Sequence, residues 1–390
     1  MLATAGASPV QTLEPSLAQP SVIETPPEFA ETPPKGTLFF VSPWIDGLLM
    51  GGLGLLVWIA LTVVGAGTYQ AVGMAGSGWL LAAAILFDFP HFAAVSWPLY
   101  SHVERVKRFP ITALIWPLAL LAAMLISVRY PDTVLPCLCK AAMAWMAFHF
   151  AAQTAGLTLL YLRRAGFNPS RAEGLCVNAA SYLGMLYALL STEARDRPLS
   201  FGSLQEAIPR FPVTEDVGLL VALLFGCALT GIVACGLLAK VRRGRWWPPI
   251  ALVPLAAQAL WFVPEAGSYD LFTRLLCFGC VHGLQYLTLA VAVEAAEVRA
   301  QHSEWSRGQV LSNLALFYPI LLGLGAAVFL ALPWLLQPLR VAAHLVGPAF
   351  LAALWMHHAF VDGGLNKPRS PQAARLADLT LAREGWEARP

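Results

Sequence analysis

Charge is scarce along this chain of 390 residues. Only 12% of the residues are Asp, Glu, Lys or Arg, whereas 57% are hydrophobic. An average soluble protein has about 25% charged residues, so a soluble globule of this length would lack half of its usual surface charge. A net charge of +2, spread over scattered Lys and Arg, also argues against a nucleic-acid-binding protein. The composition predicts an integral membrane protein.

Recognisable cofactor motifs are also scarce. The seven Cys residues all fall within apolar stretches, where we interpret them as small buried apolar residues rather than as a disulfide framework. A c-type haem attachment site needs a His directly after its second Cys, but Val281 separates Cys280 from His282. The sequence has neither a ferredoxin-like Cys set nor a dinucleotide-binding Gly loop, so any electron donor would be a separate protein.

Long apolar runs dominate what remains. A helix needs about 20 apolar residues to cross the hydrocarbon core of a bilayer. The sequence therefore predicts an all-α, polytopic membrane bundle of about ten helices over residues 39–366, between a disordered Pro/Glu-rich tail (1–38) and a polar cytoplasmic tail (367–390). The ten segments are 46–69, 78–100, 110–129, 133–162, 175–192, 216–239, 248–264, 271–297, 310–336 and 338–362.

The basic residues of the loops are distributed unequally between the two sides of this bundle. With ten crossings, 18 of the 25 Lys and Arg residues lie on the side that holds both tails and six on the other. Basic residues are concentrated in cytoplasmic loops. We therefore expect both termini in the cytoplasm, and we expect the protein to lie in a bacterial inner (cytoplasmic) membrane.

Polar residues interrupt the apolar runs in four of the even-numbered segments. Each interruption contains a His, with a second polar residue three to five positions away in the chain. A charged side chain at the centre of a bilayer costs about 2.5–3.5 kcal/mol on insertion scales, so these residues are candidates for function. The four interruptions are Asp88 with His91, His149 with Gln153, His282 with Gln285 and Tyr286, and His357 and His358 with Asp362.

The positions of these residues place them at a similar depth. His91 and His149 each lie 14 residues before the first basic residue that follows their helix, and Gln285 lies 14 residues before Arg299. Because an α-helix rises 1.5 Å per residue, the side chains are expected in one layer. Pro90 cannot donate to the carbonyl of Leu86 and is expected to kink its helix beside this layer.

Imidazole and carboxylate groups that converge from several helices favour a metal site. Imidazole is a ligand for Fe, Zn and Cu, and carboxylate favours Fe or Mn. Polar neighbours commonly orient such ligands, a role for which Gln153, Gln285 and Tyr286 are candidates. The predicted metal ligands are His91, His149, His282, His357 and His358, with Asp88 and Asp362 as further ligands or as groups that orient a His.

The motifs together resemble those of a poorly characterised family of bacterial multi-pass membrane proteins. They are the opening Ser42-Pro43-Trp44-Ile45-Asp46 followed by D-x-x-H, F-H-x-x-x-Q, H-G-x-Q-Y and H-H-x-x-x-D-G. The chain is also similar, more distantly, to histidine-dependent membrane oxygenases, namely the fatty-acid desaturase and hydroxylase superfamily and the Brp/Blh carotene oxygenases. That likeness implies non-haem iron, O₂ and a lipid or isoprenoid substrate. The desaturase boxes H-x-x-x-H and H-x-x-H-H are absent.

Three functions are compatible with these patterns. The first is a non-haem iron oxygenase, desaturase or hydroxylase of the membrane. The second is a haem-binding electron-transfer subunit, for which His91 and His149 have the best-matched depths. The third is a proton- or ion-coupled transporter in which Asp88, His91, His149 and His282 form a relay. The absence of a clear relation between the two halves of the chain counts against the transporter. No residue is assigned a catalytic role.

Overall fold

A computed structural model describes residues 38–64, 78, 80–101, 103–194, 200–201, 204–205, 208–262, 271–331 and 343–365. The predicted tails, 1–38 and 367–390, lie almost entirely outside these residues. The described chain is helical apart from one antiparallel pair of two-residue strands. The elements are α1 (Pro43–Gly47), η1 (Leu48–Gly52), α2 (Leu53–Val64), η2 (Ala84–Asp88), α4 (Phe89–Tyr100), α5 (Val103–Arg108), η3 (Ile111–Ile115), α6 (Trp116–Arg129), α7 (Val134–Arg164), α8 (Arg171–Ala194), β1 (Ser200–Phe201), β2 (Leu204–Gln205), α9 (Glu215–Arg243), α10 (Pro249–Phe262), α11 (Leu271–Gln301), α12 (Arg307–Ala326), η5 (Ala327–Ala331) and α14 (Ala343–Leu365).

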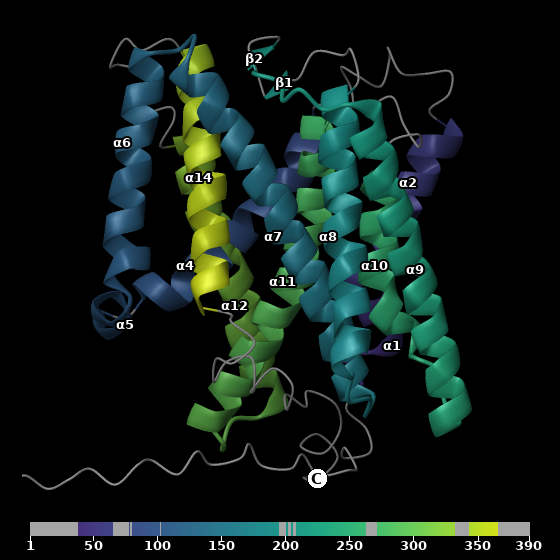
Figure 1. Cartoon of the computed structure of the whole chain (residues 1–390). Coiled ribbons are helices and arrows are strands. Elements are labelled where there is room, and N and C mark those ends of the chain that lie inside the picture. Colours follow the sequence, from purple (N-terminus) through teal and green to yellow (C-terminus); the bar gives the residue numbers. More distant parts are fainter. Residues whose placement is uncertain are drawn as a thin grey trace, which may run out of the picture.

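The long helices stand side by side as one bundle (Figure 1). Among the described residues, nine helices are long and apolar enough to cross a membrane. Each coincides with one of the ten predicted segments. The remaining segment, 248–264, is α10, which has 14 residues and spans only about 21 Å, less than the hydrocarbon thickness of about 30 Å. The described structure therefore confirms an all-helical bundle with nine helices of crossing length rather than ten.

Hydrogen bonds join the start of the first long helix to α7. The carboxylate of Asp46 accepts hydrogen bonds from the backbone amides of Phe40 (2.6 Å) and Val41 (2.9 Å) and from the hydroxyl of Tyr161 (2.8 Å). The amide of Ser42 donates to it as well (3.4 Å), so four donors satisfy this buried carboxylate. The acid of the Ser-Pro-Trp-Ile-Asp motif consequently has a structural role in joining the start of α1 to α7.

Short π-helical segments interrupt several of the long helices. The segment η2 immediately precedes α4, and the amide of Phe89 bonds to the carbonyl of Ala84, five residues earlier. Pro90 has no amide hydrogen, so the carbonyl of Leu86 lacks its usual intrahelical donor. The hydroxyl of Tyr318, on α12, donates to that carbonyl instead. The irregularity expected at Pro90 is therefore present as a π-helical turn, and a neighbouring helix satisfies the carbonyl that it leaves without an amide donor.

Two glycines let neighbouring helices approach the backbone of this irregular turn. A Cβ atom at Gly283 of α11 would lie 2.5 Å from the carbonyl oxygen of Phe87. One at Gly325 of α12 would lie 2.4 Å from the carbonyl oxygen of Phe89. Both distances are shorter than any real Cβ contact, so only glycine allows the two helices to pack at this depth. The segment from η2 into α4 is held between α11 and α12.

Substitution of Gly283 tests this close approach. Gly283→Ala is expected to reduce the free energy of unfolding by about 1–3 kcal/mol, because overpacking forces the backbone of α11 away from η2. The measurement is the midpoint of thermal unfolding of the purified protein in one detergent. Gly156→Ala is the matched control, since a Cβ there meets nothing within 4 Å, and its midpoint should be unchanged or slightly raised. Equal midpoints for the two variants would contradict the proposed packing.

Candidate metal centre

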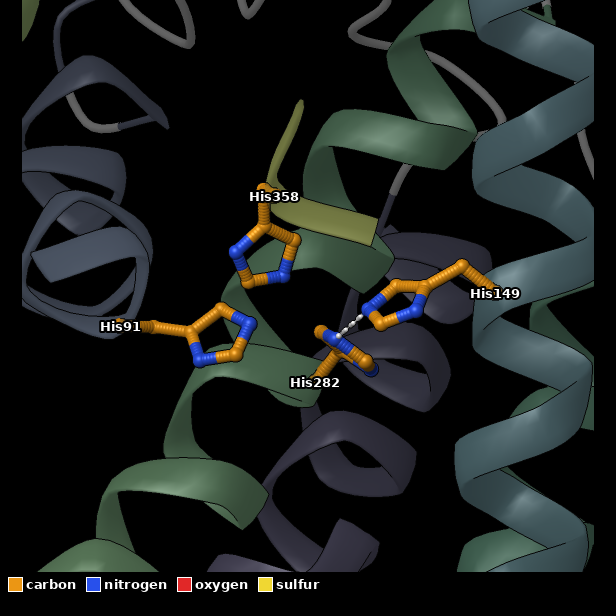
Figure 2. Close-up of side chains that lie close together, drawn as sticks. All are labelled: His91, His149, His282 and His358. Atoms are coloured by element: carbon orange, nitrogen blue, oxygen red, sulfur yellow. Dashed lines mark hydrogen bonds between the residues drawn. The ribbon is translucent and has the colours of Figure 1, made fainter. Parts of the chain in front are cut away.

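Four imidazoles from four different helices meet inside the bundle. They are His91 of α4, His149 of α7, His282 of α11 and His358 of α14. Each is at most 5% exposed, and His149 is the midpoint of the 31-residue helix α7. One nitrogen from each ring lies within 4.8 Å of one nitrogen from every other ring. Figure 2 shows the four rings facing a common centre from separate helices.

The spacing within this four-His group suits ligands of one small ion. The Nε2 atoms of His149 and His282 are 2.9 Å apart, and the ring centroids of His91 and His358 are 4.4 Å apart. Two nitrogens bound to one ion at about 2.0–2.1 Å would be separated by about 2.9–3.4 Å. The pair formed by His149 and His282 already has this spacing. One nitrogen from each of the other two rings lies within 4.8 Å of this pair.

Most of the nitrogens in the group have no hydrogen-bond partner among the described residues. These are both nitrogens of His91, both of His358 and Nδ1 of His282. Leaving a buried polar atom unpaired costs about 1–3 kcal/mol, and the helices could have avoided that cost with apolar side chains. Unpaired lone pairs directed at a shared centre are what a metal site requires. The residues present therefore fit a metal ion.

A carboxylate lies just behind the group. Oδ2 of Asp362 is 3.7 Å from Nδ1 of His149, on the opposite side of that ring from the contact with His282. A carboxylate on the outer nitrogen of a metal-binding His fixes its tautomer and orientation. Of the two predicted functions for Asp362, its position fits orientation of His149 rather than membership of the four-His group.

The structure does not bring His357 and Asp88 into the four-His group. Nε2 of His357 is 2.9 Å from the hydroxyl of Tyr100, so the two consecutive histidines of α14 point to different surroundings. Asp88 is buried and faces Gly279 of α11, where a Cβ would lie 3.5 Å from Oδ1. Neighbouring positions in a motif predicted shared ligation, but adjacent residues of an α-helix point about 100° apart around its axis, so His357 and His358 face different neighbours.

The amides predicted to orient histidines bond mainly to backbone instead. Nε2 of Gln153 donates to the carbonyl of His282 (3.2 Å) and to Oε1 of Gln285 (3.0 Å). Nε2 of Gln285 donates to the carbonyl of Met50 in η1 (2.9 Å). The two glutamines thus join α7, α11 and η1 at the depth of the group, and they position the helix that carries His282 rather than its ring.

Aromatic rings surround the histidines. Tyr286, predicted to orient a His, packs its ring 4.7 Å from that of His91. Phe92 lies 4.2 Å from His358 and Phe150 lies 4.7 Å from His282, measured between ring centroids. The two phenylalanines were not predicted as part of the site, although each directly follows a predicted ligand in the sequence. Together these rings place the imidazoles in an apolar environment.

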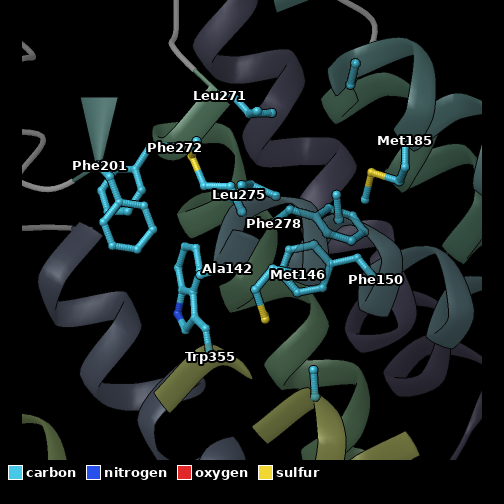
Figure 3. Close-up of a cluster of buried hydrophobic side chains, with 14 of the residues drawn as sticks. Ala142, Met146, Phe150, Met185, Phe201, Leu271, Phe272, Leu275, Phe278 and Trp355 are labelled. Carbon is cyan, nitrogen blue, oxygen red and sulfur yellow. The ribbon is translucent and has the colours of Figure 1, made fainter. Parts of the chain in front are cut away.

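A buried aromatic cluster fills the bundle between the four-His group and its upper end in Figure 1. Phe201, which is fully buried, packs against Phe272 and Trp355 with centroid distances of 4.8 and 5.4 Å (Figure 3). Lys140, near the start of α7, forms a buried ion pair with Glu193, near the end of α8. Apolar packing therefore separates the histidines from that end of the bundle.

The fold and the site define a bundle of long apolar helices with a buried four-His group that could hold a metal ion. No family model, no curated protein and no solved structure matches the chain significantly. The resemblance to a multi-pass membrane family is consistent with the helices and the histidines, and it stays a prediction.

Tyr318 was also missed by the sequence analysis. Pro90 signals that the carbonyl of Leu86 needs a donor, but nothing in the sequence identifies which residue supplies it.

Tyr318→Phe is expected to lower the free energy of unfolding by about 1 kcal/mol. In a Pro90→Ala background the same change should cost less, because the new amide can serve the carbonyl. A double-mutant cycle of thermal or denaturant unfolding measures the difference, and perfect additivity would contradict the bond.

Proposed function

We propose that this protein is a membrane-embedded metalloenzyme whose metal ion is held by His91, His149, His282 and His358. The observation that carries the proposal is the convergence of four buried imidazoles, with donor atoms within 4.8 Å of one another and most of their nitrogens unpaired among the described residues. Nine apolar helices of crossing length in the described chain support a membrane location. The bias of loop charge supports a bacterial inner membrane with cytoplasmic termini.

Non-haem iron is the proposed metal, and the proposed reaction is that of an oxygenase, desaturase or hydroxylase. Imidazole ligands suit iron as well as zinc and copper, and bound iron would supply the activation of O₂. The protein would contribute the rest: Asp362 fixes His149, the glutamine pair fixes the backbone at His282, and the surrounding rings limit access of water. An electron donor would be a separate protein.

A lipid or isoprenoid is the proposed substrate class, reaching the site sideways from the bilayer. Phe329 of η5 is partly exposed and stacks on Phe89 at 4.1 Å. Its ring also meets Phe92 at 4.9 Å, and Phe92 in turn contacts His358. A continuous series of aromatic contacts thus leads from the surface of η5 to the four-His group. An apolar chain lying along this series would replace contacts with lipid by contacts with aromatic rings.

The geometry favours a bare ion over haem. Two axial histidines of a haem stand on opposite faces of the macrocycle with the porphyrin between them. Here His149 and His282 are in direct contact, and the other two rings occupy the space around them where a porphyrin would lie. No specific contact among the described residues supports a transporter. An apolar cluster, rather than a polar path, fills the bundle above the histidines.

Elemental analysis of the purified protein tests the proposal. His358→Ala is expected to abolish binding of roughly one metal ion per chain, as are His149→Ala and His282→Ala, because each removes a ligand from a small site. His357→Ala is the matched control, one residue away on the same helix, and should retain the ion. Inductively coupled plasma mass spectrometry for Fe, Zn, Cu and Mn gives the content, and an absorption spectrum should lack a Soret band. Equal metal content in all variants would refute the site.

Asp362 and Asp88 make a second matched pair. Asp362→Asn is expected to weaken Fe(II) binding by about 10–100-fold, because the carboxylate no longer fixes His149. Asp88→Asn should leave the affinity nearly unchanged, since Asp88 lies outside the four-His group. Anaerobic Fe(II) titration of apoprotein gives both dissociation constants. If Asp88→Asn weakened binding and Asp362→Asn did not, the assigned roles would have to be reversed.

A further inference from the structure

A cluster of basic residues lies away from the four-His group, at the end of α9. Its last turn and the following residues carry four cations: Lys240, Arg242, Arg243 and Arg245. Gly244 ends the helix in the left-handed conformation with φ +67°. This reversal lets residues on either side of Gly244 reach the same neighbour.

That neighbour is a single aromatic ring. The Cζ atoms of Arg243 and Arg245 lie 5.5 and 5.1 Å from the centroid of Phe167, in the loop between α7 and α8. Phe167 is only 3% exposed, and its amide bonds to the carbonyl of Leu162 at 2.9 Å. An Nη2 donor of Arg243 also reaches the carbonyl of Asn168 at 3.4 Å. The two guanidinium groups are therefore positioned by a fixed part of the protein.

These cations have no acidic partner within the described chain. None of the four forms an ion pair with a described Asp or Glu, and the Nζ of Lys240 donates to the carbonyl of Gly244 (3.0 Å). Glu173, in the first turn of α8, accepts a hydrogen bond from the amide of Ser170 (2.6 Å) and serves as a helix cap. Two like charges gathered on one ring repel each other, and an anion bound between them would offset that repulsion.

The apolar neighbours of the cations indicate where that anion comes from. Val241 is 81% exposed and Trp246 is 54% exposed. An exposed Trp next to Lys and Arg is typical of the level of the lipid headgroups, and basic pockets at helix ends bind anionic headgroups. A soluble anion would leave the exposed valine and tryptophan in water, whereas the acyl chains of a phospholipid would cover them.

We propose that Arg243 and Arg245, gathered on Phe167, bind the phosphate of an anionic phospholipid, whose acyl chains lie against Val241 and Trp246. The proposal does not depend on the metal site. It does rest on the proposed membrane location.

The test uses the full-length protein in detergent, titrated with dioleoyl phosphatidylglycerol and followed by native mass spectrometry. The double variant Arg243→Gln and Arg245→Gln is expected to bind this lipid roughly thirtyfold more weakly. The matched control is Lys107→Gln with Arg108→Gln on α5. Lys107 pairs with Glu104 at 2.9 Å, and Arg108 is alone over its ring, that of Phe109, at 5.7 Å. The control should bind within about threefold of the unmodified protein.

The other outcomes are distinguishable. Unmodified protein should bind dioleoyl phosphatidylcholine far more weakly than phosphatidylglycerol, and millimolar inorganic phosphate should not displace the lipid. Displacement by phosphate would overturn the lipid assignment in favour of a soluble anion. Equal losses in the two double variants would overturn the site in favour of general attraction between basic loops and the lipid. Metal content should be the same in both, so failure of this proposal leaves the metal centre standing.

Discussion

Burial of imidazole nitrogens without hydrogen-bond partners is the constraint around which the centre of this molecule is organised. Five such nitrogens, from His91, His282 and His358, have no partner among the described residues. In an apolar bundle every unpaired polar atom reduces stability. The four helices that supply the four-His group therefore benefit from any ligand that satisfies these atoms together, and metal binding would become part of the folding free energy.

The irregular backbone beside the site follows from the same geometry. Pro90 removes an amide from the helix that carries His91, the π-helical turn η2 absorbs the change, and Tyr318 supplies the missing donor. Gly283, one residue after His282, lets α11 approach η2 closely. Departures from regular helix are tolerated in membrane proteins where neighbouring helices satisfy the freed groups. Here they bring two of the histidine-bearing helices together.

Much of the fold was predictable because the signals are local. Scarce charge and runs of apolar residues predict membrane helices, since a bilayer demands a continuous apolar length. Nine of the ten segments have that length in the described structure, and α10 falls short. For the site, His91, His149 and His282 stood out as polar residues at similar depth in otherwise apolar helices. Depth follows from counting residues, so it can be read from a sequence.

The sequence by itself determined which residues share a depth, and the tertiary structure decided which share a centre. His357 and His358 are equally plausible ligands in the sequence, but rotation of α14 about its axis directs only His358 into the four-His group. The same rotation puts Asp362 behind His149. How far a helix is rotated depends on its contacts with three neighbours at once, through glycines, prolines and rings on other helices. Those contacts join residues separated by hundreds of positions, so no local pattern specifies them.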